Sequence, residues 1–181
     1  MRQTLGQVQE RAPVRPTPEG TLPATGTPTV KEIPYDHVAT FTLQGRRGNR
    51  VQDVINVSTD GAFVAVSIGY SFIPANLATN AAPNQRVIDF LYSIIDSGSG
   101  RELQNKAIHN IAGLGEPNGN RPFRPFAKPM LFMPRSTIRI EVEEVSADAG
   151  GIDPAPPFYQ GAQLFIVFHG YKLLGYGTGL P

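Results

Sequence analysis

The sequence predicts an all-β protein, a single β-sandwich of jelly-roll or Greek-key type that follows an extended proline-rich arm. Three observations predict this fold. Apolar residues alternate with polar ones in several short runs, 19 Gly and 17 Pro punctuate the 181 residues, and no strand–helix–strand alternation is visible. A chain of this length holds one core plus an appendage. We therefore expect an arm at 1–34, a β-sandwich at 35–175 and a short C-terminal tail at 176–181.

The first 34 residues carry almost no large apolar side chain and cannot form a core. Proline fixes φ and favours extended geometry in the residue before it, so the segment should sample polyproline II conformations, reaching up to about 100 Å. A disordered tail is one interpretation. We expect instead that contacts with another subunit hold the segment, because it cannot order itself. The prolines proposed as interface residues are Pro13, Pro16, Pro18, Pro23 and Pro28.

Period-two patterns predict the first strands of the domain. In 35–44, one apolar face carries Ala39, Phe41 and Leu43. Residues 51–72 contain two strand-like runs joined by Ser-Thr-Asp-Gly, and the Asp-Gly pair is typical of a hairpin turn.

The second of these runs has two unlike faces. Its large apolar face is formed by Val64, Val66, Ile68, Tyr70 and Phe72. The opposite face is formed by Ala65, Ser67, Gly69 and Ser71. Small residues would let a second sheet or another subunit approach closely, although a plain solvent-facing surface is the simpler interpretation.

The remaining runs vary in clarity. Residues 87–96 fit a strand or a helix, and we favour a strand because β-branched and aromatic residues dominate. Residues 101–129 are expected to be mostly connection, with at most one short strand or helical turn before Gly113, since their prolines disfavour a regular central element. The alternation in 137–144 predicts a strand with one wet face, whereas 162–175 is apolar on both faces and should lie centrally in a sheet.

Composition excludes several classes of partner. The 16 basic and 15 acidic residues nearly cancel, so nucleic acid is not expected as the main partner. The absence of cysteine rules out disulfides and thiolate chemistry. The N-terminus lacks the apolar region of a secretory signal, and the longest apolar runs fall short of the roughly 20 residues of a spanning helix. We therefore expect a soluble or assembled protein without a membrane partner.

No catalytic, cofactor or metal site is predicted. His37, His109 and His169 are far apart in the sequence and are interpreted as ordinary strand, loop or interface residues. Glu141, Glu143 and Glu144 could suggest acid–base catalysis. Glu141 and Glu143 alternate with apolar residues, so we interpret them as part of a solvated strand face. The glycine-rich segments match no phosphate-binding motif. We accordingly expect that the protein is not an enzyme.

Two basic clusters remain, at 46–50 and at 121–128, the second in a segment rich in Pro and Phe. Solvated loops are the first interpretation, a protein interface the second and nucleic acid the third. The residues proposed for an interface are Arg46, Arg47, Arg50, Phe123, Arg124 and Phe126.

Two segments carry a resemblance to a known class of proteins. Residues 132–144 read FMPRSTIRIEVEE and residues 164–172 read LFIVFHGYK. With SGSGRELQN and RPFRPFAKPM before them, they resemble small virion structural proteins of tailed bacteriophages, where an F-x-P-x-S-x-I-x-V-E strand and a closing L-F-I-V-x-H-G-Y-K strand belong to a β-sandwich. The resemblance covers residues 97–174. It implies a structural, oligomeric role and leaves capsid decoration, head-to-tail connector and tail or baseplate positions open.

The leading hypothesis is therefore a non-enzymatic virion subunit that forms a homo-oligomer in a symmetric assembly with other virion proteins. In this hypothesis the arm ties each subunit to its neighbours. The alternative is a carbohydrate- or ligand-binding β-sandwich module of a larger assembly. The absence of Trp disfavours that alternative, since such sites present exposed aromatic rings beside polar groups.

Overall fold

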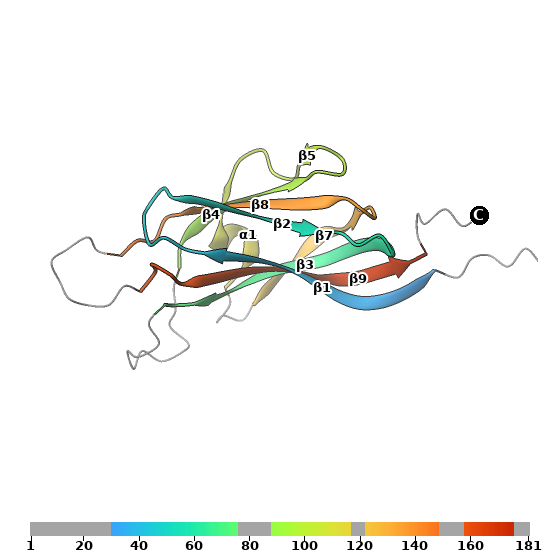
Figure 1. The fold of residues 1–181 in the computed structure, drawn as a ribbon, viewed down its shortest axis with the longest axis horizontal. Coiled ribbons are helices and arrows are strands. Elements are labelled where there is room, and N and C mark those ends of the chain that lie inside the picture. Colours follow the sequence, from blue (N-terminus) through green and yellow to red (C-terminus); the bar gives the residue numbers. More distant parts are fainter. Residues whose placement is uncertain (1–29, 76–87, 117–121, 149–157, 176–181) are drawn as a thin grey trace, which may run out of the picture.

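Two antiparallel sheets packed face to face make up the domain (Figure 1). The computed structural model describes residues 30–75, 88–116, 122–148 and 158–175. The predicted arm prolines Pro13 to Pro28 and the predicted tail at 176–181 lie outside these residues.

One sheet, the β9 sheet, has the strand order β1-β9-β3-β7. Its strands are β1 (Lys31–Thr42), β9 (Gln163–Leu174), β3 (Gly61–Ile73) and β7 (Phe123–Phe132). The other, the β8 sheet, has the order β2-β8-β4-β5, and β6 also pairs with β4. Its strands are β2 (Arg50–Asn56), β8 (Thr137–Glu144), β4 (Phe90–Asp96), β5 (Arg101–Glu102) and β6 (Ile108–His109), and the short helix α1 (Asn110–Leu114) follows β6.

The strand pairs are nested along the chain. β1 pairs with β9, β2 with β8, β3 with β7 and β4 with β5, so each pair encloses the next. Such nesting describes one long antiparallel ribbon whose successive pairs lie alternately in the two sheets. The further pairs β3–β9 and β4–β8 join the ribbon into two complete sheets. This arrangement is a jelly roll, which confirms the predicted all-β sandwich.

The core lies between the sheets and consists of large aliphatic and aromatic side chains. Its largest fully buried members include Phe41, Phe63, Phe90, Phe132, Phe168, Leu164 and Ile166. The predicted inward face of β1 is confirmed, because Ala39, Phe41 and Leu43 are buried. The predicted central position of β9 is also confirmed, since β1 and β3 flank it.

The ambiguous segment 87–96 contains strand β4, as predicted. Phe90, Tyr92 and Ile94 are buried while the residues between them are half-buried, which is the burial pattern of a strand packed on one side. The alternation predicted for β8 is confirmed in the same way, with Ile138 and Ile140 fully buried.

The hairpin predicted at Asp60-Gly61 is wrong. The strands on either side, β2 and β3, lie in different sheets, and β2 pairs with β8 while β3 pairs with β9 and β7. In a jelly roll the two halves of the chain run antiparallel as one ribbon, so a strand pairs with a strand far along the chain rather than with the next one. The turn therefore carries the chain from one sheet to the other.

The single large apolar face predicted for β3 is also wrong, because the register of β3 shifts between Ala65 and Ser67. Phe63 and Ala65 face the core before this bulge. After it, the core-facing residues are Ile68, Tyr70 and Phe72. Val66 at the bulge is exposed. A bulge inserts one extra residue, so it exchanges the two faces of a strand.

Residues 101–129 were expected to be connection, but β7 begins within them and is ten residues long. It tolerates Pro125 and Pro129 because it is an edge strand.

At the other edge of this sheet, β1 begins at Lys31 and includes Pro34, ahead of the expected domain start. The amide of Thr40 donates to Asp53 in β2 rather than to β9. Backbone amides two residues apart in a strand point the same way, so the backbone nitrogen of Pro34 also faces away from β9, towards the free edge.

Candidate interaction surface

The outer face of the β9 sheet is the most distinctive surface of the domain. Cross-strand partners share a face, so the pairing register defines five rows across this surface. We call this surface the β9 face. Its rows are Pro34-Tyr171-Val64-Leu131, Asp36-His169-Ser67-Pro125, Val38-Val167-Gly69-Phe123, Thr40-Phe165-Ser71 and Thr42-Gln163-Ile73.

The β9 face carries little charge. Among the positions in its five rows, the acidic and basic side chains are Asp36 and His169, whose Oδ2 and Nδ1 atoms lie 3.2 Å apart. A further row at one end, Glu32-Leu173-Ala62, adds one carboxylate to this face. The row between those of Asp36 and Thr40 is apolar throughout, and its two ends, Val38 and Phe123, are 49% and 48% exposed. An exposed apolar stripe of this kind across a sheet marks an interaction site.

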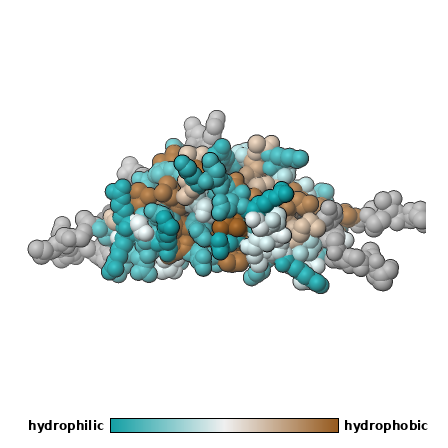
Figure 2. Space-filling view, turned by 90° about the horizontal axis from the view of Figure 1, so that it is seen from above, coloured by the Kyte–Doolittle hydropathy of each residue, from teal (hydrophilic) through white to brown (hydrophobic). Residues whose placement is uncertain are grey.

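The outer face of the β8 sheet has the opposite character. Its central strand presents Arg139, Glu141 and Glu143, and Arg50 of β2 pairs with Glu143 at 2.7 Å. Figure 2 views the molecule from this side, and hydrophilic side chains cover most of it, with smaller hydrophobic patches between them. This face is suited to water, whereas the β9 face is suited to a partner.

The β9 face has a ridge that runs along its central strand. The ridge is formed by the outward side chains of β9, namely Phe165, Val167, His169 and Tyr171. The outward residues of β3 beside it, Ser67, Gly69 and Ser71, are small. Ser67 and Gly69 are buried, because the rings of Phe123 and His169 meet over β3 with their centroids 5.9 Å apart. A Cβ atom at Gly69 would lie 3.1 Å from the carbonyl oxygen of Pro122 and 3.2 Å from the Cβ of Phe123, so a larger residue would crowd β7.

The predicted interface residues of β7 do not lie together. The Phe123 ring lies on the β9 face, with its centroid 5.9 Å from that of His169. Arg124 points to the other side of the strand, where its guanidinium donates to the carbonyl oxygen of Ala112 in α1. Phe126 packs towards the core, 6.3 Å from Phe168 between ring centroids.

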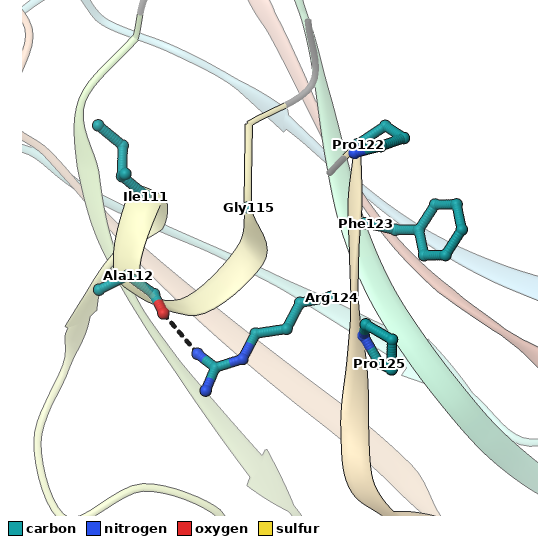
Figure 3. Close-up of a pocket in the computed structure, with 7 residues that line it drawn as sticks. All are labelled: Ile111, Ala112, Gly115, Pro122, Phe123, Arg124 and Pro125. Carbon is teal, nitrogen blue, oxygen red and sulfur yellow. Dashed lines mark hydrogen bonds between the residues drawn. The ribbon is translucent and has the colours of Figure 1, made fainter. Parts of the chain in front are cut away.

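A hollow of about 630 Å³ lies where β7 meets α1 (Figure 3). Its lining residues are Ile111, Ala112, Gly115, Pro122, Phe123, Arg124 and Pro125. The side chains are mainly apolar, and the charged group of Arg124 already bonds to the helix backbone. The hollow adjoins the β9 face at Phe123 and extends it at one corner.

The predicted basic cluster at 46–50 is a turn held by a buried carboxylate. Glu144 is 2% exposed. Its Oε1 accepts hydrogen bonds from the Gln44 amide at 2.8 Å and from Asn49 Nδ2 at 2.7 Å. Its Oε2 accepts from the amides of Gly45 at 2.8 Å and Arg46 at 3.2 Å. The Arg46 and Arg47 side chains are exposed, and Arg50 pairs with Glu143 on the β8 sheet.

No face was predicted for Glu144, and the alternation of β8 places it on the side of Ile140 and Val142. That alternation was the signal that could have identified it. Asp148 plays a similar part nearby, since it accepts from the amides of Phe158, Tyr159 and Gln160 at 2.8 to 2.9 Å. Partial burial opposes ionisation of Asp148, but these three donors lower its pKa.

The histidines lie apart in the structure. His37 is buried and its Nε2 has no hydrogen-bond partner, and burial together with the charge of Lys172 lowers its pKa. His109 lies 3.7 Å from Asp89 and His169 pairs with Asp36. In the part of the chain that the structure describes, no three metal-ligating side chains gather. No helix within the described ranges is long and apolar enough to span a membrane.

No protein-family model matches the chain, and no curated protein matches it either. Among solved structures, one described as that of infectious bursal disease virus, Gx strain, aligns with 82% of this chain at 12% sequence identity and a TM-score of 0.30. The alignment covers 37% of that viral chain. These comparisons do not assign a function to the protein.

Proposed function

We propose that this protein is a non-enzymatic structural subunit of a virus particle and that it assembles through the β9 face. The observation that carries the proposal is the contrast between its two outer surfaces. The β8 sheet presents paired charges to water, whereas the β9 face presents exposed Val38 and Phe123 in a row without charge. A surface of this composition becomes stable when another protein covers it.

The fold and the sequence resemblance agree with a virion role. Jelly rolls occur in viral capsid subunits, although the same fold also serves lectins and cupins, so the fold alone does not define the activity. The two segments that resemble phage structural proteins occupy the end of β7 with β8, and β9. A capsid-decoration, connector or tail position is compatible with these features.

The predicted arm would strengthen such an assembly. β1 begins at Lys31 and is an edge strand of the β9 sheet. An extended segment of the length of residues 1–29 spans up to about 90 Å at ~3.1 Å per residue, enough to reach past a neighbouring subunit. Attachment there would raise the effective concentration of each subunit for its neighbours.

Deletion of residues 1–29 tests this proposal and leaves β1 intact. We expect the full chain to co-purify with virus particles at a fixed copy number, measured by quantitative mass spectrometry. The truncated chain should keep its β-sheet circular dichroism and be lost from the particles. Full incorporation of the truncated chain would refute the role of the arm. Absence of the full chain from particles would refute the virion role itself.

The hollow beside Phe123 favours a second candidate function, a carbohydrate-binding module. An exposed aromatic ring at the rim of a cavity can stack on a sugar. The lining offers few free polar groups for sugar hydroxyls, which makes this candidate the weaker one. A glycan array with the wild-type chain and Phe123→Ala would separate the two functions, since a module of this kind binds specific glycans and loses them with the ring.

A further inference from the structure

We infer that a second cavity, which opens between the two sheets beside β7, binds a carboxylate with an apolar chain of about the size of a medium-chain fatty acid. We call it the inter-sheet cavity. It is distinct from the hollow beside Phe123 and does not involve the exposed row of the β9 face, so this inference goes beyond the proposed function. Its support is the place of the cavity in the fold, its apolar lining and the positive charge at one end.

The sandwich is closed along one side and open along the other. On the closed side, the Thr40 amide of β1 donates to Asp53 of β2 at 2.8 Å and so joins the two sheets. On the other side, β7 is the edge strand of the β9 sheet, and within the described residues it pairs with β3 and with no strand of the β8 sheet. A ligand can therefore enter between the sheets on the β7 side.

Both sheets contribute apolar side chains to the inter-sheet cavity, which has a volume of about 380 Å³. Its aliphatic and aromatic lining residues include Ile68, Ile94, Leu103, Ile108, Phe126 and Met130. Ile68 and Ile94 belong to the buried core, whereas Leu103 is 36% exposed, so the cavity runs from solvent to the core. At ~30 Å³ per non-hydrogen atom, the share of a water molecule in the liquid, this volume holds about a dozen atoms, the size of a decanoate ion.

Three polar side chains of the lining lie together near α1, namely Tyr92, Gln104 and Arg124. The Tyr92 hydroxyl lies against Gly113 of α1, where a Cβ atom would overlap it. Gln104 Oε1 accepts a hydrogen bond from the Ile94 amide at 2.9 Å, which fixes its side chain. Burial raises the pKa of Tyr92, while the nearby charge of Arg124 and a hydrogen bond with Gln104 act against this rise. The hydroxyl therefore stays protonated at neutral pH and can donate.

Arg124 supplies a positive charge that has no acidic partner among the described residues. Its guanidinium carries five N–H donors, and one of its terminal nitrogens donates to the carbonyl oxygen of Ala112. Figure 3 shows the other terminal nitrogen directed away from that carbonyl. The described lining of the cavity contains no acidic side chain. A carboxylate fits this end because the planar guanidinium can bind its two oxygens, while the apolar chain of the ligand fills the rest of the cavity.

Isothermal titration calorimetry of the full chain with sodium decanoate tests the inference at about pH 8, where the carboxylate is ionised. We expect one site with a dissociation constant below about 1 mM. Decyltrimethylammonium, which has the same apolar chain and the opposite charge, should bind at least about tenfold more weakly, because its charge is repelled by Arg124. This comparison uses the wild-type chain, so it does not depend on the folding of any variant.

Two variants test the position of the ligand. Arg124→Met should weaken decanoate binding by about tenfold or more, because hydrogen bonds to a charged group are lost. Arg46→Met is the matched control, since Arg46 is also exposed but lies in the turn that Glu144 holds, and it should bind like the wild type. Ala127→Phe should also weaken binding about tenfold or more, because Ala127 is an exposed lining residue and a ring there would occupy the cavity.

The inference would be overturned by any of three results. The first is no binding of decanoate to the wild type up to about 1 mM. The second is binding of decyltrimethylammonium as tight as that of decanoate. The third is equal decanoate binding by the Arg124→Met, Ala127→Phe and Arg46→Met variants, with circular dichroism showing that all three are folded.

Discussion

Glu144→Gln is the substitution that tests most directly how the end of the sandwich is held. The buried carboxylate accepts four hydrogen bonds, from three consecutive amides and from Asn49 Nδ2. Glutamine has the same shape, but one of its two terminal atoms is a donor. Each oxygen of the Glu144 carboxylate accepts two hydrogen bonds, so the NH2 group of a glutamine would face two N–H donors in either orientation.

The size of the effect follows from those bonds. Rotation of the Asn49 amide can rescue one contact, which leaves one amide without its acceptor at a cost of about 1 to 3 kcal/mol. The three remaining bonds lose their charge assistance, and charge-assisted bonds contribute about 1.5 to 3 kcal/mol against about 0.5 to 1.5 for neutral ones. These terms sum to about 4 to 7 kcal/mol, but a neutral amide avoids the desolvation cost of a buried carboxylate, so we expect a net loss of about 3 to 5 kcal/mol in the free energy of unfolding.

Equilibrium unfolding in urea, followed by circular dichroism, measures this loss. The matched controls are Glu141→Gln and Glu143→Gln on the same strand, whose side chains face outward in surface ion pairs. Each should cost less than about 1 kcal/mol. A Glu144→Gln variant within 1 kcal/mol of the wild type would show that solvent, rather than this carboxylate, satisfies the turn amides.

Two further substitutions have definite expected outcomes, beside those of the arm and of the inter-sheet cavity. Because burial and the charge of Lys172 lower the pKa of His37, the unfolded chain binds the proton more tightly, so stability falls as pH drops below about 6.5. His37→Phe should reduce that slope between about pH 5 and 7 in urea titrations, and an unchanged slope would contradict this. Gly170→Ala should cost at least about 2 kcal/mol, because its Cβ would overlap the carbonyl oxygen of Val64, whereas Gly48→Ala, with open space around it, should cost about 1 kcal/mol. Equal losses in the two alanine variants would contradict the packing at Gly170.

The elements that the sequence predicted well are those whose burial is uniform along their length. β8 alternates without interruption, and β9 is apolar on both faces, which is typical of a central strand. β4 could be separated from a helix by its β-branched and aromatic content, which suits a pleated surface. Local pattern was sufficient in these three cases.

The predictions that failed depend on contacts between distant parts of the chain. Asp60-Gly61 has the composition of a hairpin turn, yet the strands that it joins find their partners more than 60 residues away, in β8 and β9. The bulge after Ala65 shifts the register of β3 against both β7 and β9 and leaves no mark in the alternation of the β3 sequence. Residue composition does not encode which strand lies beside which.

The candidate surface was predictable only in part. The small residues of β3 indicated a face that another sheet could approach, but on the β9 face Ser67 and Gly69 are already buried beneath the rings of Phe123 and His169. The ridge on β9 was hidden, because a strand that is apolar on both faces does not reveal which side is covered. Arg124 appeared as a free cation in the sequence, but its guanidinium bonds to a helix carbonyl that lies close only in the folded chain.

The prolines at the two borders of the β9 sheet have a consequence for how copies of the protein can accumulate. Pro34 in β1, with Pro125 and Pro129 in β7, removes backbone donors at the places where an added strand would need them. Asp53 occupies a further donor, the amide of Thr40. Sheet growth by strand addition, the route to amyloid-like fibres, is thereby discouraged even at the high local concentration of an assembly site. Association by edge pairing is thereby disfavoured at both borders of this sheet, which leaves its broad outer face as the surface for contact with a partner.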